Sequence, residues 1–254
     1  MPMRLTKSLD RGTRFVQKLL GPEITRWVQE NLGSQGSRFV REVLGRSARH
    51  RVQAACRKEL IGSGNSAWVI CPDGLTPQSV VYSLGVGNEV SFDLALIERF
   101  GVEVLAFDPT PESIAWVKAQ SLPKQFHLLE CGIANFDGVA KFHHLGGVQW
   151  SIYNTPASVD PHCCEVYRLH TIMKSLGHKR IDLLKINIEG GEYAVIDDLI
   201  ASQINVGQLV VEFHHRFTGH TLAETESAVN ILNEYGYKIF YISDAGKEYS
   251  FIRR

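Results

Sequence analysis

A regular alternation of short apolar runs and helical segments is the feature of this sequence that most constrains its fold. The alternation extends over residues 66–254. The apolar runs, each of a length that suits a buried strand, are 79–84, 102–107, 126–130, 139–144, 181–188 and 208–213. Helical periodicity appears at 91–100, 111–120, 192–201 and 221–235. Strands that alternate with helices in this way predict a parallel sheet with helices on both faces.

The last two apolar runs, 237–242 and 248–252, lie on either side of a turn at Asp244-Ala245-Gly246. They predict a hairpin, so one of its strands must be antiparallel to its neighbours in the sheet. The expected architecture is therefore an α/β domain whose sheet is mostly parallel and ends in an antiparallel C-terminal strand.

Residues 1–61 differ from the rest of the chain. Apolar residues recur there at helical spacing, and the Gly- and Ser-rich stretch 61–66 is the best domain boundary. The predicted domains are a helical extension, 1–61, and an α/β domain, 66–254. Residues 1–60 hold 13 Lys and Arg but 5 Asp and Glu. A basic element that touches a membrane surface, an anionic substrate or the acidic domain is one interpretation, and solvated helix faces are the other. Exposed helical stripes would also suit a homodimer.

Composition excludes several classes of protein. The formal net charge is zero, so the overall charge gives no reason to expect nucleic acid as a partner. The sequence has no run of 18 apolar residues, so no transmembrane helix is expected, and no secretory signal is expected. The five cysteines form no C-x-x-C pair, which favours reduced thiols in a cytoplasmic protein over a disulfide framework. The adjacent Cys163 and Cys164 are poorly placed to share a metal, and no metal site is predicted.

A ligand site is expected at the carboxyl ends of the first strands. Ligands of open α/β sheets bind there, at the point where the strand order reverses. Gly85 and Gly87 follow the first strand and allow a sharp turn and a close backbone approach to a ligand. Asp108 ends the second strand and can accept hydrogen bonds from the hydroxyls of an adenosine ribose, although a turn residue is the alternative. Gly132, after the third run, is a further candidate cofactor residue.

The loop chemistry favours S-adenosylmethionine (SAM) over a dinucleotide. A dinucleotide fingerprint requires a third glycine, but Val90 occupies that position. Glu89 suits the cationic amino group of SAM and would repel a pyrophosphate. A nicotinamide-dependent oxidoreductase remains the rival enzyme class, because it would use the same Gly85, Gly87 and Asp108.

Several segments resemble the FkbM-type methyltransferases. LLKINIEGGE (183–192) resembles the LLK-x-D-x-EG-x-E signature of that family, and YSLGVG (82–87) followed by SFD (91–93) resembles a first motif of one branch. RLHTI (168–172) and VEFH (211–214) are similar to the segments around its fourth and fifth strands. The resemblance covers about residues 66–254. It implies a Rossmann-like class I methyltransferase fold and SAM-dependent transfer, typically to a hydroxyl oxygen of a small molecule or sugar.

Two positions depart from the family pattern. Ser83 stands where many methyltransferases carry an acidic residue at the end of strand one. We therefore expect Ser83 in the cofactor site and Glu89 as the anchor of the amino-acid tail. Asn187 stands where the family often has Asp, and an amide cannot act as a general base. These two departures support the alternative of a non-catalytic SAM-binding protein.

Methyl transfer to oxygen needs a group that removes the acceptor proton. Histidine is the side chain best poised for this near neutral pH, so we predict His214 as general base, with Asn187 and Glu189 orienting acceptor and cofactor. A surface role for His214 and a helix-start role for Glu192 are the alternatives. Glu189, Glu212 and His214 could instead hold Mg²⁺, but their spacing is not diagnostic.

Aromatic residues are candidates for the wall of an acceptor pocket. A sugar ring would stack on such side chains, and core packing is the alternative. The candidates are Trp68, Trp150, Tyr153 and Tyr167.

Overall fold

The computed structural model describes residues 50–146, 149–152, 161–215 and 219–253. His50–Ser243 and Lys247–Arg254 form one compact unit, to which everything below refers. The helices predicted between residues 1 and 49 lie outside the described residues, and so does Tyr153.

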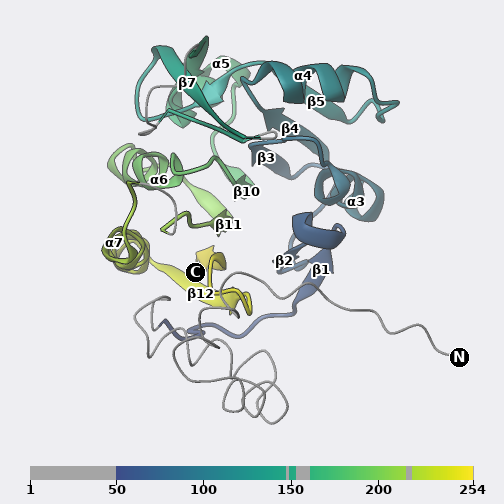
Figure 1. Ribbon diagram of the computed structural model, residues 1–254. Helices are drawn as coiled ribbons and strands as arrows, with labels where there is room; N and C mark the ends of the chain where they lie inside the picture. Colours follow the sequence, from purple (N-terminus) through teal and green to yellow (C-terminus); the bar gives the residue numbers. More distant parts are fainter. Residues whose placement is uncertain (1–49, 147–148, 153–160, 216–218, 254) are drawn as a thin grey trace, which may run out of the picture. The chain divides into compact units, whose positions relative to one another are not determined.

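A seven-stranded sheet forms the centre of this unit (Figure 1). Its strands, in spatial order, are β12 (Tyr237–Ile242), β13 (Glu248–Arg253), β11 (Val206–Glu212), β10 (Ile181–Ile186), β3 (Val80–Leu84), β4 (Glu103–Phe107) and β5 (Phe126–Leu129). β13 runs antiparallel to both of its neighbours, whereas β11, β10, β3, β4 and β5 are parallel. The predicted α/β sheet with a reversed C-terminal strand is confirmed. Strand order reverses between β3 and β10, which makes this edge the expected ligand site.

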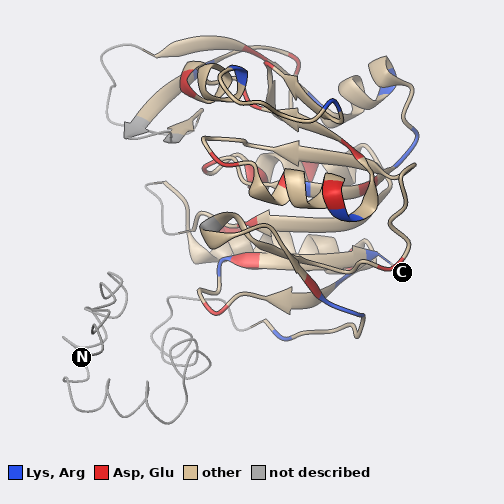
Figure 2. Cartoon of the chain, turned by 90° about the vertical axis from the view of Figure 1, so that its right-hand side faces the viewer, with Lys and Arg blue, Asp and Glu red and all other residues tan. Residues whose placement is uncertain are grey.

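Helices cover both faces of the sheet, as the alternation predicts. On one face, α5 (Leu169–Leu176), α6 (Glu192–Ala201) and α7 (Leu222–Glu234) bury side chains such as Leu199 and Val229 against the strands. On the other face, α3 (Ser91–Phe100) and α4 (Pro111–Lys118) contribute Leu96 and Val117 to a second core. Figure 2 shows that charged residues are sparse on the strands and gather mainly on helices and loops. Such strands are apolar on both faces because both faces are buried.

Local signals place several helix ends. The bounds of α3 and α6 are those predicted, and α4 ends two residues before its predicted end. α7 begins after Thr221, whose hydroxyl accepts a hydrogen bond from the Glu224 backbone N–H at 3.4 Å. The Glu224 carboxylate accepts one in return from the Thr221 backbone N–H at 2.6 Å. This capping box satisfies two N–H groups that the helix itself leaves unpaired.

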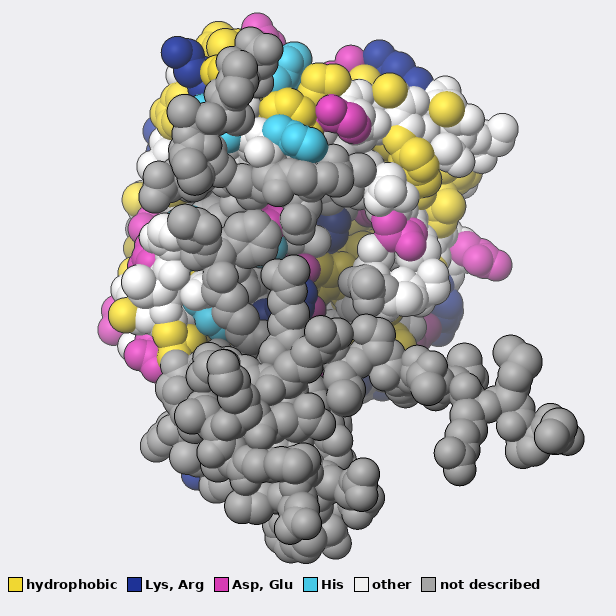
Figure 3. All heavy atoms as spheres, in the orientation of Figure 1, with side chains coloured by type: hydrophobic (Ala, Val, Ile, Leu, Met, Phe, Trp, Pro, Cys, Tyr) yellow, Lys and Arg dark blue, Asp and Glu magenta, His cyan; other side chains and the backbone are white. Residues whose placement is uncertain are grey.

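A second, four-stranded sheet is inserted between β5 and α5. Its order is β6 (Gly132–Ile133), β9 (His162–Tyr167), β7 (Gly138–Gly146) and β8 (Gln149–Ser151). Of these strands, the sequence predicts only β7. Figure 3 shows histidine side chains among hydrophobic ones on the upper part of the visible face, where Figure 1 places β7.

A short hairpin precedes the main sheet. β1 (Glu59–Ile61) pairs antiparallel with β2 (Trp68–Ile70), and a 3-10 turn, η1 (Gly64–Ser66), lies between them. The predicted boundary at 61–66 therefore falls inside a hairpin, and residues 50–61 contain a strand instead of a helix. The backbone N–H groups of Gln53 and Ala54 both donate to the Ile239 carbonyl, which ties this segment to β12.

Two further expectations concern membranes and thiols. Of the described helices, none combines the length and hydropathy needed to cross a membrane. All five cysteines are free thiols.

Candidate functional site

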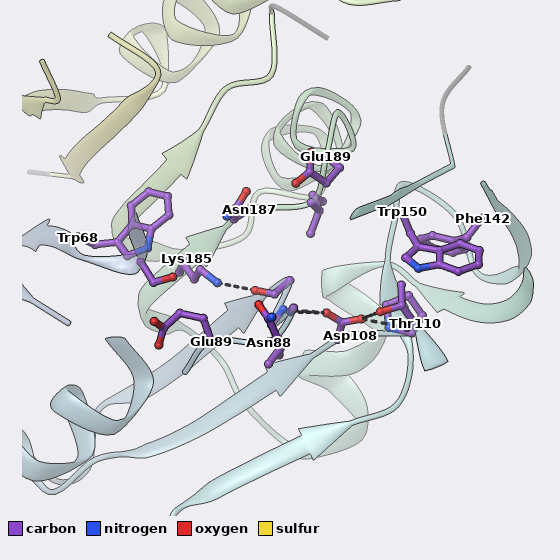
Figure 4. Close-up of a pocket in the computed structure, with 16 residues that line it drawn as sticks. Trp68, Asn88, Glu89, Asp108, Thr110, Phe142, Trp150, Lys185, Asn187 and Glu189 are labelled. Atoms are coloured by element: carbon purple, nitrogen blue, oxygen red, sulfur yellow. Dashed lines mark hydrogen bonds between the residues drawn. The ribbon is translucent and has the colours of Figure 1, made fainter. Parts of the chain in front are cut away.

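A cavity of about 390 Å³ opens at the carboxyl ends of β3, β4 and β10 (Figure 4). The loops after these strands, 85–89, 108–110 and 187–189, form most of its wall. Phe142 and Trp150 from the small sheet line it as well, as does Trp68 from the hairpin. The cavity thus lies at the edge of the sheet where the strand order reverses, as the strand pattern predicts.

The glycine loop packs directly on the end of β10. Gly85 has a φ of +81°, and a Cβ built there would lie 1.8 Å from the Asn187 carbonyl oxygen. The Asn187 backbone N–H donates to the Leu84 carbonyl at 3.0 Å, and the Lys185 ammonium donates to the Gly85 carbonyl. Any side chain at position 85 would push these two loops apart, so only glycine fits the contact.

Asp108 joins the loop after β3 to the loop after β4. One carboxylate oxygen accepts hydrogen bonds from the Val86 and Gly87 backbone N–H groups, at 2.8 and 3.0 Å. The other accepts from the Thr110 backbone N–H at 2.9 Å and from the Thr110 hydroxyl at 2.6 Å. A ribose hydroxyl would have to compete with these donors, because a carboxylate offers about four acceptor positions.

Two buried opposite charges lie beneath the glycine loop. Lys185 is 6% exposed and Asp93, on α3, is 1% exposed. Burial lowers the pKa of Lys185, and the charge of Asp93 opposes that shift. Burial raises the pKa of Asp93, and the charge of Lys185 opposes that shift in turn. Each charge therefore stabilises the other in a region where an unpaired charge would be expensive.

His214 lies among three carboxylates behind the cavity wall. Its Nδ1 is 3.2 Å from Glu192, its Nε2 is 3.4 Å from Glu189, and Glu212 lies 3.9 Å from the same Nε2. Burial lowers the pKa of His214, but the hydrogen bond and charge of Glu192, with the charges of Glu189 and Glu212, outweigh it and raise the pKa. These carboxylates therefore favour the charged form of the ring more than water would.

The small sheet contributes an aromatic end to the cavity. Figure 4 shows the rings of Phe142 and Trp150 at the end of the cavity where Asp108 and Thr110 lie. The Trp150 ring also packs against His144, with 4.9 Å between centroids. Its Nε1–H and the Oδ1 atom of Asn187 are buried and have no hydrogen-bond partner within the described part of the chain. The cavity wall thus offers one unused donor and one unused acceptor to a ligand.

Comparison with known families identifies the chain. The model of the methyltransferase FkbM domain matches residues 86–239, which is more than half of the sequence. The chain belongs to the FkbM methyltransferase family. The family resemblance seen in the sequence is confirmed.

Relatives of this FkbM methyltransferase include two mammalian proteins. "Probable methyltransferase-like protein 24" of Rattus norvegicus is 26% identical over 178 residues, which cover 66% of this chain and 44% of that protein. The Homo sapiens protein of the same name is 26% identical over 200 residues, which cover 72% of this chain and 49% of that protein. The chain thus spans less than half of the length of these curated relatives. Among solved structures, methyltransferase FkbM from Methylobacillus flagellatus KT is 12% identical with a TM-score of 0.45, covering 70% of this chain and 44% of that chain.

The cavity residues of this FkbM domain fit the cofactor that the family implies. Gly85 and Gly87 leave space for a close backbone approach, and Phe142 and Trp150 present ring faces that suit an adenine. The carboxylates of Glu89 and Glu189 also line the cavity and suit a cationic sulfonium or ammonium group.

The structure brings most of the predicted site residues to one cavity. Those that line it are Gly85, Gly87, Glu89, Asp108, Asn187 and Glu189, together with Trp68 and Trp150. Ser83, Gly132, His214 and Tyr167 are not among the lining residues. The functional roles of all these residues stay predictions.

Packing explains why three predicted site residues lie behind the wall. Ser83 is fully buried within β3. A Cβ on Gly132 would contact Val166, Phe142 and Pro109, so Gly132 allows close packing of the small sheet instead of facing the cavity. His214 does not line the cavity, and Glu189, which does, lies 3.4 Å from its Nε2. No group of His, Cys, Asp and Glu in the described ranges is arranged to hold a metal, including Glu189, Glu212 and His214.

Sequence reasoning missed Lys185, Asp93 and Phe142. A signal for the first two was present, because a lysine in the apolar run 181–188 needs a buried partner and Asp93 belongs to the SFD motif. Phe142 carried no comparable signal, since nothing in the run 139–144 indicates which face meets a ligand.

Proposed function

We propose that this chain transfers the methyl group of SAM to a hydroxyl oxygen of a small molecule or sugar. The observation that carries the proposal is the cavity at the strand-order reversal, where the glycine loop, Asp108 and the polar pair Asn187 and Glu189 meet. SAM supplies an activated methyl group, so the protein must mainly hold the acceptor oxygen in line with it and receive a proton.

The arrangement of side chains in Figure 4 supports one orientation of the cofactor. Asp108 lies between the aromatic end, with Phe142 and Trp150, and the opposite end, with Glu89 and Lys185. A ribose beside Asp108 would therefore direct its base toward the aromatic rings and its amino-acid tail toward the charged end. The unpaired Nε1–H of Trp150 suits an acceptor nitrogen of the base.

The loop after β10 supports the acceptor side of the proposal. Asn187 presents a buried oxygen without a partner, and Glu189 presents a carboxylate at the cavity wall. Both groups can accept a hydrogen bond from a hydroxyl, and the ring of Trp68, which also lines the cavity, suits the apolar face of a sugar. An acceptor that offers hydroxyl donors and a flat apolar face is the ligand class that matches these groups.

Calorimetry with S-adenosylhomocysteine tests the cofactor half of this proposal. We expect the wild-type chain to bind, and we expect Asp108→Ala to bind at least tenfold more weakly, a loss of about 1.4 kcal/mol. Glu98→Ala removes an exposed carboxylate from α3 and serves as the matched control with unchanged binding. Absence of binding by the wild type would falsify the proposal. Circular dichroism of each variant separates lost binding from lost folding.

The acceptor half needs a separate screen. Methyl-labelled SAM is offered with a panel of sugars, nucleotide-sugars and other hydroxyl compounds, and label in an ether product identifies the acceptor. Transfer only to nitrogen or carbon nucleophiles would contradict the proposal.

We also propose a division of the chain into a helical N-terminal extension and a methyltransferase domain. The hairpin β1–β2 and the bonds of Gln53 and Ala54 to β12 support an assignment of residues from His50 onward to the methyltransferase domain.

A further inference from the structure

The ring of His214 is enclosed by carboxylates from three different elements. Glu189 comes from the loop after β10, Glu192 from the start of α6 and Glu212 from the end of β11. His214 is 5% exposed, and Glu192 is fully buried. The His214 backbone N–H also donates to Glu192, at 2.7 Å. Such an arrangement holds the ring in one place and gives both nitrogens an acidic neighbour.

We propose that His214 is held as an imidazolium between Glu192 and Glu189, and that Glu189, rather than His214, receives the proton of the acceptor hydroxyl. His214 is then a positioning residue. This inference rests on the proposed function, because it names the group that completes the transfer.

The geometry disfavours His214 as the base. A general base needs an unshared electron pair within hydrogen-bond reach of the acceptor proton. A protonated ring has no such pair, and here Nδ1 is hydrogen-bonded to Glu192 while Nε2 faces the Glu189 carboxylate at 3.4 Å. His214 also does not line the cavity, whereas Glu189 does.

Glu189 is held firmly at the cavity wall. It is a non-glycine residue with a positive φ of 47°, a conformation that costs energy and is found preferentially at functional sites. The Ser151 hydroxyl donates to its carbonyl at 2.7 Å, which links the small sheet to this loop. The next backbone N–H, that of Gly190, donates to Glu192 at 2.9 Å. Glu192 therefore orients both His214 and the backbone that carries Glu189.

Of the three carboxylates around the ring, Glu189 is the one that lines the cavity. Glu212 pairs with Lys247, which also lies 3.3 Å from Glu248. Glu192 is fully buried. A proton released inside the cavity therefore reaches Glu189 before it reaches the other two carboxylates.

Methyl transfer forms one bond to the methyl carbon and breaks another. The acceptor oxygen forms a bond to the methyl carbon, and the bond between that carbon and the sulfonium sulfur breaks with its electron pair left on sulfur. The hydroxyl proton passes to the Glu189 carboxylate and from there to water after the products leave. His214 keeps its own proton throughout.

Nuclear magnetic resonance of the 254-residue chain tests the charge state of His214 without any acceptor. The ten histidines are labelled with ¹⁵N, and the signal that disappears in His214→Gln identifies this ring. We expect both nitrogens of His214 to show imidazolium shifts at pH 7.5, and we expect Glu189→Gln to lower the pKa of the ring. A neutral tautomer at pH 7.5 in the wild type overturns the proposal.

Kinetics with the acceptor found in the screen test the two roles. We expect Glu189→Gln to lower kcat by at least 100-fold, which is a typical general-base contribution, while S-adenosylhomocysteine still binds. We expect His214→Gln to lower kcat by only about tenfold. The same His214→Gln variant should shift the acidic limb of the kcat–pH profile to higher pH, because loss of the imidazolium charge raises the pKa of Glu189. A merely structural residue would not move that limb. Retention of kcat by Glu189→Gln overturns the proposal.

The two hypotheses fail in different ways. If the chain does not bind S-adenosylhomocysteine, the proposed function fails, while the spectrum still reports the charge on His214. If it binds and transfers but the ring is neutral, only the assignment of roles fails.

Discussion

Replacement of Gly85 by alanine tests the contact on which the cavity depends. An alanine held in the left-handed region costs about 1–2 kcal/mol. The new Cβ would also lie 1.8 Å from the Asn187 carbonyl oxygen, whereas real Cβ contacts are not shorter than 3.0 Å. The end of β10 must therefore move by more than 1 Å, an overpacking that costs about 1–3 kcal/mol. That movement breaks the Asn187–Leu84 and Lys185–Gly85 hydrogen bonds, at about 1 kcal/mol each. The expected loss is about 4–7 kcal/mol.

Gly177→Ala is the matched control. Gly177 ends α5 with a φ of +74°, and a Cβ there would meet nothing within 4 Å. This variant carries the backbone cost of about 1–2 kcal/mol without the clash. Comparison of the two variants therefore isolates the contact between the glycine loop and β10.

Urea unfolding followed by circular dichroism measures the loss of unfolding free energy in both variants. Calorimetry with S-adenosylhomocysteine measures whether the cavity still binds a ligand. A loss of 4–7 kcal/mol approaches the whole stability of many domains, about 5–15 kcal/mol, so we expect Gly85→Ala to be partly unfolded and unable to bind. Equal losses for the two alanine variants would refute the reasoning, because they would show that the loop can move away from Asn187 at no cost.

Three other predictions concern charge and ligand contacts. Asp93→Asn should destabilise the chain by up to about 3–5 kcal/mol, because it removes the carboxylate that contributes most to stabilising the buried Lys185 ammonium. Urea unfolding should show that adding Lys185→Met recovers much of the loss, and additive losses would contradict the pairing. The pKa of His214 is raised above its ordinary 6.5 in the folded chain, so its stabilising contribution is complete below pH 6.5 and disappears as the pH rises through the folded pKa. The stability difference between wild type and His214→Gln, measured by urea unfolding over pH 5.5–9, should therefore shrink as the pH rises, and a constant difference would contradict this sign. Trp150→Phe keeps a ring but removes the unpaired N–H, so calorimetry should show S-adenosylhomocysteine bound about three- to tenfold more weakly; unchanged affinity would show that this N–H does not contact the cofactor.

The amino-acid sequence alone determined the main architecture, because the relevant signals are local. A strand that is buried on both faces appears in the sequence as an uninterrupted apolar run. A capping box, such as that of Thr221 and Glu224, marks the start of a helix within four residues of sequence. The meeting of Gly85 with Asp108 was also predictable, since the carboxyl ends of adjacent parallel strands share one edge of the sheet.

Only the tertiary structure decided what lies around those residues. The strands β6 and β8 span two and three residues, too few for a periodic signal, and they exist through pairing with β9 and β7. The charge of His214 depends on carboxylates that three separate elements bring together, and the same histidine on a strand end facing solvent would be an ordinary base. Spacing along the chain predicts which residues reach an edge of the sheet, whereas burial and the distance to neighbouring charges decide what each can do there.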